Sequence, residues 1–155
     1  MSSKEIHIAT PNGSWELRFP RESWTLEQKK RLPDGTAYYF FFSEPKSGVN
    51  LSFFLEPATK CKTSSECREM FWSNPGPGYQ GAEGFERFDL NGFSILKCFV
   101  PFTVGGIKAR QINYSAHLVR DGYWVDMHIS KVPAESGDDE VIRSLVSSIT
   151  FHARL

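Results

Sequence analysis

Two histidines and an aspartate, His117, Asp126 and His128, are the strongest candidates for chemistry in this sequence. They lie on two segments joined by Asp121-Gly122, a dipeptide that favours a two-residue β-hairpin turn because both positions need positive φ. A turn of this length places His117 opposite Asp126, with Cβ atoms about 4.5–5.5 Å apart. Two imidazoles and a carboxylate at such distances are suited to bind a metal ion, or to let the carboxylate orient a histidine base.

The polar face of the same hairpin offers a simpler interpretation. Between residues 108 and 132 apolar and polar side chains alternate, which predicts one buried face and one polar face. Three ligands on a flat sheet need a wall that excludes water, so a polar face with one His–Asp pair, covered by solvent or by a helix, is favoured over a metal site. The sequence therefore predicts no metal ligands, with His117, Asp126 and His128 as the candidates to examine.

Other catalytic motifs are absent from the sequence. It contains no Gly-x-Ser-x-Gly nucleophile elbow and no Gly-x-x-x-x-Gly-Lys-Ser/Thr phosphate loop. The acidic run 138–140 is explained by the first turn of a helix, where the macrodipole favours anions. We therefore expect no catalytic residues and no cofactor.

The three cysteines leave two alternatives open. Cys61 and Cys67 lie just before and inside a predicted helix, so a disulfide between them would lock the start of that helix and imply an oxidising compartment. The other alternative is three free thiols, with Cys98 standing alone in either case. No apolar run is long enough for a membrane span, and no signal-peptide core is present at the N-terminus. We expect a cytoplasmic protein as the chain stands, or a periplasmic one if an export signal was removed and Cys61–Cys67 is a disulfide.

Alternating and helical patterns predict the order strands, helix, strands, helix. Strands are expected at 15–19, 24–32, 38–43 and 49–55 as an antiparallel meander, then at 85–90 and 93–102, in both arms of the 108–132 hairpin, and in a short terminal segment within 150–155. A helix is expected to begin near Thr63, where Thr63 and Glu66 match a capping box, and to stop at Asn74. A second helix, capped by Ser136 or Asp138, carries an apolar stripe over 141–149. Runs of strands punctuated by helices favour an α+β fold, a twisted antiparallel sheet of six or seven strands with helices packed on it.

Size and charge narrow the class of protein. A chain of 155 residues is expected to form one domain, 1–155, large enough to bury ~68–70% of its unfolded surface. Its 14% aromatic content suits β-structure, and Phe40, Phe42 and Phe53 are expected in the core. The 18 basic and 18 acidic residues cancel, which weighs against a nucleic-acid partner.

Large aromatic residues outside the expected core favour an interface. Trp72, Tyr79, Phe85 and Trp124 fall in loops or at outward-facing positions, where aromatic side chains can anchor a partner. Filling space beneath the Gly- and Pro-rich loop that follows Asn74 is the competing role for each of them.

The layout of the chain resembles one known superfamily. The segment Trp15-Glu16-Leu17-Arg18-Phe19-Pro20 followed by Trp24, then hairpins, one helix, a long hairpin and a last helix that runs into Ser148-Ile149-Thr150-Phe151, is similar to the PsbP-like (Mog-type) α/β/α sandwich superfamily. The resemblance spans nearly the whole chain and implies a six- or seven-stranded antiparallel sheet between helices. It also implies a mostly non-catalytic protein, because members include photosystem extrinsic subunits, a GTPase-binding nuclear transport factor, bacterial lipoproteins, secretion chaperones and immunity proteins. A shared fold does not fix function.

Together these observations predict a soluble, non-catalytic protein-binding module. The expected biological form is a bacterial immunity or accessory protein of a toxin or secretion system, whose partner is another protein such as a secreted effector, with a homodimer as a further candidate. Two alternatives stay open: a metal-dependent or small-ligand-binding enzyme that uses His117, Asp126 and His128, and a structural subunit of a larger assembly.

Overall fold

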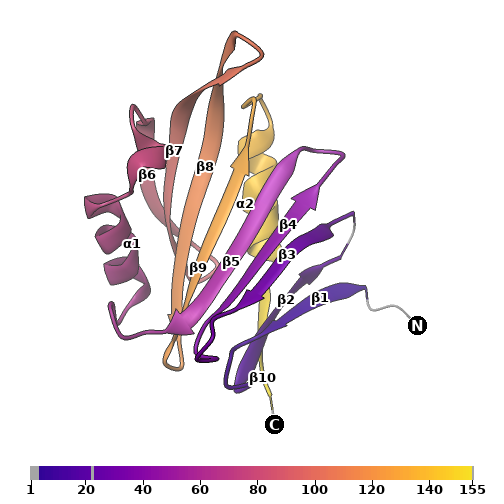
Figure 1. Ribbon diagram of the computed structural model, residues 1–155, viewed down its shortest axis with the longest axis vertical. Coiled ribbons are helices and arrows are strands. Elements are labelled where there is room, and N and C mark those ends of the chain that lie inside the picture. The colour runs from indigo at the N-terminus through magenta and orange to yellow at the C-terminus, as the bar shows by residue number, and fades with distance from the viewer. Residues whose placement is uncertain (1–3, 22, 155) are drawn as a thin grey trace.

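A computed structural model describes residues 4–21 and 23–154 and has an α+β fold (Figure 1). The residues left outside are Met1–Ser3 in the polar N-terminal segment, Glu22, and Leu155 at the end of the expected terminal strand. The strands are β1 (Glu5–Ala9), β2 (Trp15–Pro20), β3 (Thr25–Arg31), β4 (Tyr38–Glu44), β5 (Val49–Pro57), β6 (Glu83–Leu90), β7 (Phe93–Val104), β8 (Ile107–Arg120), β9 (Tyr123–Lys131) and β10 (Thr150–Ala153). The helices are α1 (Ser64–Ser73) and α2 (Asp138–Ser148), with a short 3₁₀ turn, η1, at Pro77–Tyr79.

A seven-stranded antiparallel sheet forms the centre of the molecule, in the order β3-β4-β5-β9-β8-β7-β6. The predicted central hairpin is confirmed as β8 and β9, and its register pairs His117 with Asp126. The turn residues Asp121 and Gly122 adopt φ of 48° and 82°, as a two-residue turn of this hand requires. The turn dipeptide therefore sets the register between β8 and β9.

The N-terminal strands form a second, three-stranded sheet in the order β1-β2-β10. The prediction that β2 starts a four-stranded meander is wrong, because β2 pairs with β1 and with β10 and does not pair with β3. The alternation of Trp15, Leu17 and Phe19 marks a buried face correctly, but the partner of that face is the seven-stranded sheet packed opposite. The strand β1, in a segment expected to be polar, is short and buries only Ile6 and Ile8 on its inner face.

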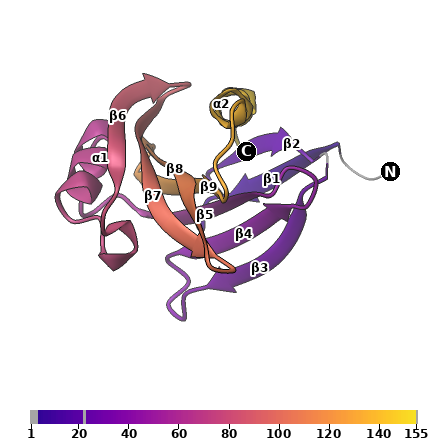
Figure 2. The ribbon, with the colours of Figure 1, turned by 90° about the horizontal axis from the view of Figure 1, so that it is seen from above.

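The hydrophobic core lies between the two sheets and beneath α2 (Figure 2). Phe42 and Phe53 are buried there, while Phe40 is half-buried at the margin of the core. In α2, Ile142 and Val146 are buried, but Val141 is 52% exposed, so the apolar stripe is narrower than predicted.

The start of α2 is held to the sheet by ion pairs. The helix is capped by Gly137, and the expected cap residues Ser136 and Asp138 do not serve, because Asp138 already belongs to the first turn. Asp138 instead lies 2.8 Å from the amino group of Lys131 on β9. Asp139 lies 2.8 Å from Lys97 on β7. The acidic run therefore stabilises the helix in two ways. Its carboxylates lie at the helix N-terminus, where the macrodipole favours anions, and they form ion pairs with the sheet.

The opposite face of the seven-stranded sheet is polar and is covered in part by α1, which packs across β7 and β8 (Figure 2). As the sequence predicts, Thr63 caps α1, and its hydroxyl oxygen accepts a hydrogen bond from the Glu66 amide. The Glu66 carboxylate reaches back one residue further than a capping box requires, to the amide of Lys62. Neither α1 nor α2, nor the short turn between them, has the length and apolar character of a membrane-spanning helix in the part of the chain described.

Candidate functional site

The polar face beneath α1 brings together the residues that the sequence singled out. We call the sheet-face cluster the set formed by Asn113, Ser115 and His117 of β8, Trp124, Asp126 and His128 of β9, and Tyr79 of the loop after α1. The alternation along β8 and β9 points all six strand residues to this side, and the loop supplies Tyr79 from outside.

His117 is fully buried, and both of its ring nitrogens have partners. The indole N–H of Trp124 donates to Nδ1 at 3.2 Å, and Nε2 lies 2.9 Å from the hydroxyl of Ser115. Because an indole can only donate, Nδ1 is the acceptor, and Nε2–H donates to Ser115. Burial, assisted by the positive charge of Arg68, lowers the pKa of His117 to about 4. His117 is therefore a neutral imidazole with its lone pair already engaged.

His128, on the neighbouring strand, is held through a single ring nitrogen. Its Nε2 lies 2.8 Å from Oδ1 of Asn113 and 2.9 Å from the hydroxyl of Tyr79. The amide nitrogen of Asn113 donates to Gln111, which leaves the Asn113 oxygen to accept from His128 Nε2–H. Burial lowers the pKa of His128 to about 4, so this ring is also neutral near pH 7.

Asp126 stands between the two histidines without orienting either one. Its Oδ1 lies 3.9 Å from Nδ1 of His117, beyond hydrogen-bond distance, and that nitrogen carries no proton to donate. No group of three or more His, Cys, Asp or Glu side chains is arranged to hold a metal ion among residues 4–21 and 23–154. The geometry therefore supports neither a metal centre nor a carboxylate-oriented base at His117, Asp126 and His128.

Replacing Asp126 with Asn should stabilise the protein near neutral pH by about 1 kcal/mol. Burial, and secondarily the charge of Glu56, raise the pKa of Asp126 from 3.8 to about 6, so the ionised carboxylate costs stability above pH 6. This gain of about 1 kcal/mol allows for solvent screening, because the Asp126 side chain is 35% exposed. Urea unfolding of Asp126→Asn should show the gain near pH 7.5 and little gain near pH 4. Asp89→Asn, at a side chain that is 75% exposed, is the control, and an equal gain there would contradict the argument.

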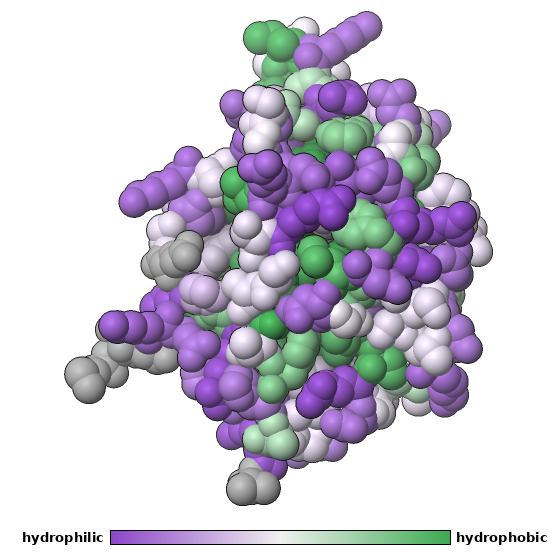
Figure 3. All heavy atoms as spheres, turned by 180° about the vertical axis from the view of Figure 1, so that it is seen from behind, coloured by the Kyte–Doolittle hydropathy of each residue, from purple (hydrophilic) through white to green (hydrophobic). Residues whose placement is uncertain are grey.

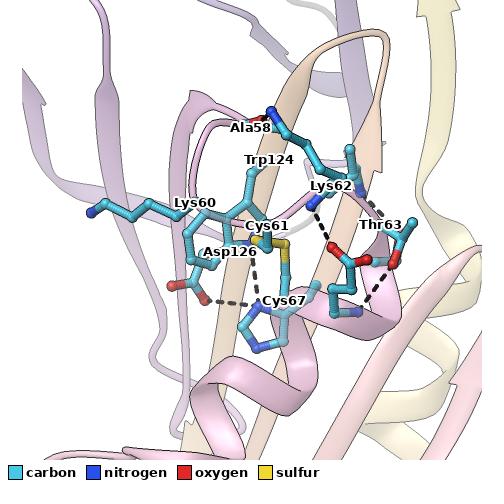
Figure 4. The surroundings of a disulfide bond; sticks show 12 residues. Ala58, Lys60, Cys61, Lys62, Thr63, Cys67, Trp124 and Asp126 are labelled. Carbon is cyan, nitrogen blue, oxygen red and sulfur yellow. Dashed lines mark hydrogen bonds and ion pairs between the residues drawn. A yellow bond between two sulfur atoms is a disulfide. The ribbon is translucent and has the colours of Figure 1, made fainter.

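A disulfide joins Cys61 and Cys67 and ties the start of α1 to the segment before it (Figure 4). The two cysteines and Trp124 form a small buried cluster of their own, separate from the main core. Trp124, a candidate partner-binding residue, faces the polar side of the sheet, as the alternation predicts. It lies covered beneath the disulfide and is therefore only 7% exposed. The third cysteine, Cys98, is a buried free thiol whose pKa is raised by burial to about 11, which makes it a poor nucleophile.

The other aromatic candidates divide into a covered residue and an exposed pair. Tyr79 is half-buried, its ring packs edge-on against Phe71 at 5.2 Å, and burial raises its pKa above the ordinary value. Trp72 on α1 and Phe85 on β6 remain 38% and 40% exposed and meet edge-on with ring centroids 4.6 Å apart. The guanidinium of Arg87 lies 5.4 Å from the Trp72 ring, a cation–π arrangement. We call Trp72, Phe85 and Arg87 the aromatic surface.

A groove of about 960 Å³ lies on the other side of the molecule, along α2. Its apolar lining includes Trp24, Val49 and Leu145, and Figure 3 shows apolar atoms at the centre of this face. The Glu44 carboxylate at its side accepts hydrogen bonds from the Ser23 hydroxyl and from the amides at 46 and 47, which hold its pKa near 2. The groove offers apolar contact and a carboxylate whose hydrogen-bonding capacity is largely used.

Arg87 and Asn113 belong to these sites but carry no motif that singles them out in the sequence. Arg87 follows Phe85 by two positions on one strand, and Asn113 precedes Ser115 by two, so alternation alone places each on the relevant face. What no local pattern supplies is the element packed against that face, here α1 and the loop with Tyr79.

Comparisons with known proteins establish the fold and no family. No protein-family model matches the chain, and no curated protein matches it in sequence. Among solved structures, a Bacteroides thetaiotaomicron protein matches with a TM-score of 0.62 and 9% identity, over 99% of this chain and 50% of that one, so the chain spans half the length of its structural neighbour. LpqN, described as involved in cell envelope biogenesis of Mycobacterium tuberculosis, matches with a TM-score of 0.42 and 12% identity, over 96% of this chain and 90% of that one. Neither description refers to the PsbP-like superfamily, so that assignment stays a prediction, while the fold is shared with the Bacteroides thetaiotaomicron structure.

Proposed function

We propose that this chain is a non-catalytic protein-binding module of PsbP-like type that recognises its partner through the aromatic surface. The observation that carries the proposal is the exposed edge-on pair of Trp72 and Phe85 with Arg87 beside it. Tryptophan and arginine are the residue types most enriched at interface hot spots. Arg87 is also ion-paired with Glu69 at 3.0 Å, which fixes its guanidinium near the ring before any partner arrives.

The state of the sheet-face cluster supports a non-catalytic role. Its two imidazoles are neutral, covered by α1 and the following loop, and hydrogen-bonded within the protein. A general base needs a free lone pair within reach of a substrate proton, and the Nδ1 lone pair of His117 is used by Trp124. The cluster is therefore better suited to holding α1 on the sheet than to turning over a substrate.

The finer proposal is a bacterial immunity or accessory protein of a toxin or secretion system. It rests on the PsbP-like layout of the sequence and on the Cys61–Cys67 disulfide, which favours an oxidising compartment such as the periplasm. In that setting the partner is a secreted effector or an envelope protein.

Removing the aromatic surface should weaken partner binding by about 30-fold or more. The variant Trp72→Ala/Phe85→Ala deletes two candidate hot-spot side chains, each worth about 2 kcal/mol at a typical interface. Because such losses are not additive, the loss of one of them, about 30-fold, is the lower bound. Wild type is first used to capture partner proteins from the native host. Calorimetry then measures the dissociation constant of each stoichiometric partner for wild type and for the double variant. Leu26→Ala, at a residue that is 50% exposed on β3, is the control and should leave affinity unchanged.

Two results would count against the proposal. A stoichiometric partner that binds the double variant as tightly as wild type would remove the aromatic surface from recognition. A stable homo-oligomer in light scattering, with no captured partner, would instead favour the structural subunit. Melting curves of the variants establish that they are folded before binding is compared.

A further inference from the structure

The hairpin formed by β7 and β8 extends beyond the rest of the seven-stranded sheet (Figure 1). Pairing of β6 with β7 reaches only Phe99, and pairing of β9 with β8 reaches only Ile112. Between these points the two strands pair with each other alone, out to Val104 and Ile107 at the turn. Residues 100–111, which we call the hairpin tip, are thus a two-stranded ribbon, with one further hydrogen bond from the Ala134 amide to the carbonyl of Arg110.

The hairpin tip has one apolar face and one cationic face. Register places Phe102 opposite Ala109 and Val104 opposite Ile107, so these four side chains share a face. Phe102, Val104 and Ile107 are 43%, 49% and 73% exposed, which concentrates exposed apolar surface at one end of the molecule (Figure 3). The other face carries Thr103 opposite Lys108 and Pro101 opposite Arg110.

The charge of the tip is of one sign. Residues 100–111 include Lys108 and Arg110 and no acidic residue, although the whole chain has a formal net charge of zero. The Arg110 guanidinium lies 4.4 Å from the centroid of the Phe99 ring, so it is held at the base of the tip, while Lys108 stands next to the turn. Apolar side chains flanked by cations are the pattern of segments that bind anionic lipid surfaces.

We propose that the hairpin tip is a membrane-interface anchor that places Phe102, Val104 and Ile107 among the headgroups of an anionic bilayer, with Lys108 and Arg110 on lipid phosphates. A protein partner fits less well, because a stable interface needs about 800 Å² from each side and three partly exposed side chains supply on the order of 300 Å². A bilayer requires no matching surface, and apolar burial and charge attraction add. The backbone groups that β7 and β8 direct toward each other are paired within the tip. Backbone groups on the two outer edges of the ribbon need water, so the tip should lie in the hydrated interface and not in the hydrocarbon core.

Vesicle binding tests the anchor directly. Wild type should cosediment with vesicles of phosphatidylcholine containing about one third phosphatidylglycerol. Its affinity should be at least about tenfold lower for vesicles of phosphatidylcholine alone, or at high salt. Ile107→Asp should abolish binding, and Lys108→Ala or Arg110→Ala should each weaken it by about fivefold. Leu26→Asp, at another exposed apolar residue on β3, is the matched control and should bind as wild type does. As an independent readout, the fluorescence of Ile107→Trp should shift to the blue on anionic vesicles.

Several outcomes would overturn the anchor. They are failure of wild type to bind anionic vesicles, unchanged binding by Ile107→Asp, and the absence of a blue shift for Ile107→Trp. Loss of a dimer in Ile107→Asp, seen by light scattering, would assign the tip to a second copy of the chain. Trp72→Ala/Phe85→Ala should bind vesicles as wild type does, so the anchor and the aromatic surface are tested separately.

Discussion

Acidification from pH 7 to pH 4 should cost the folded protein about 6 kcal/mol through His117 and His128. Each has its pKa lowered from 6.5 to about 4 in the folded state, and each shift corresponds to about 3 kcal/mol. Because the folded pKa lies below the unfolded one, this stability is fully present above pH 6.5 and is lost as the pH falls from 6.5 through 4. A typical domain has about 5–15 kcal/mol in total, so the transition should approach complete unfolding.

Asp126 acts in the opposite direction over part of the same range. Its pKa is raised to about 6, so its protonation on acidification returns about 1 kcal/mol, after allowance for the exposure of its side chain. The net loss at pH 4 is therefore about 5 kcal/mol. Both histidines contact α1 or the loop that follows it, through Phe71 and Tyr79, so we expect these segments to open first.

Urea unfolding between about pH 7 and pH 4, followed by circular dichroism, measures this loss. His117→Gln and His128→Gln should each reduce the fall in stability over that range by about half, because each removes one of two similar contributions. His152→Gln, outside the sheet-face cluster, reports the general effect of replacing an imidazole. A wild-type stability that stays level down to pH 4, or single variants that fall as steeply as wild type, would contradict the assignment.

Truncation of Trp124 should be the most damaging single substitution on the polar face, at about 3–5 kcal/mol. Its ring is 7% exposed, packs on the Cys61–Cys67 disulfide, and donates the hydrogen bond that fixes the tautomer of His117. Trp124→Ala leaves a cavity under the start of α1 and an imidazole without its donor. Trp124→Phe keeps much of the apolar contact, so it should cost less while still raising the pKa of His117.

Equilibrium unfolding of Trp124→Ala, Trp124→Phe and wild type gives the three values to compare. Trp72→Ala is the matched control, because its ring is 38% exposed and its loss should cost about 1 kcal/mol or less. Equal losses for the two Ala variants would show that Trp124 does not hold α1 in place. Hydrogen exchange should locate the excess loss of protection for Trp124→Ala in α1 and in β9.

The register of the sheet was predictable because it depends on short-range chemistry. Asn91-Gly92 and Asp121-Gly122 each place two positive φ angles between alternating strands, which fixes the pairing on either side. The pairing of His117 with Asp126 follows from that register alone. The disulfide was one of two open alternatives, since spacing brings Cys61 near Cys67 and does not decide whether they bond.

Long-range packing was not predictable from the same patterns. Alternation in β2 identifies its buried face but not the sheet it belongs to, which led to the wrong meander. Alternation likewise turns Trp124 to the polar side, whereas its burial depends on α1 and on the disulfide above it. Spacing likewise places His117 opposite Asp126 but does not show the partners of its two ring nitrogens, Ser115 and Trp124.

The order of the central sheet has a consequence for how the chain assembles. Strands β3 to β5 and strands β6 to β9 each form from consecutive hairpins, and the two groups meet along a single seam, where Asn50 pairs with Ser130. Contacts between residues so distant in sequence close late, after the local hairpins have formed. Until then β5 presents Leu51 and Phe53 beside an open backbone edge, which makes this strand the segment most vulnerable to pairing with other copies during synthesis.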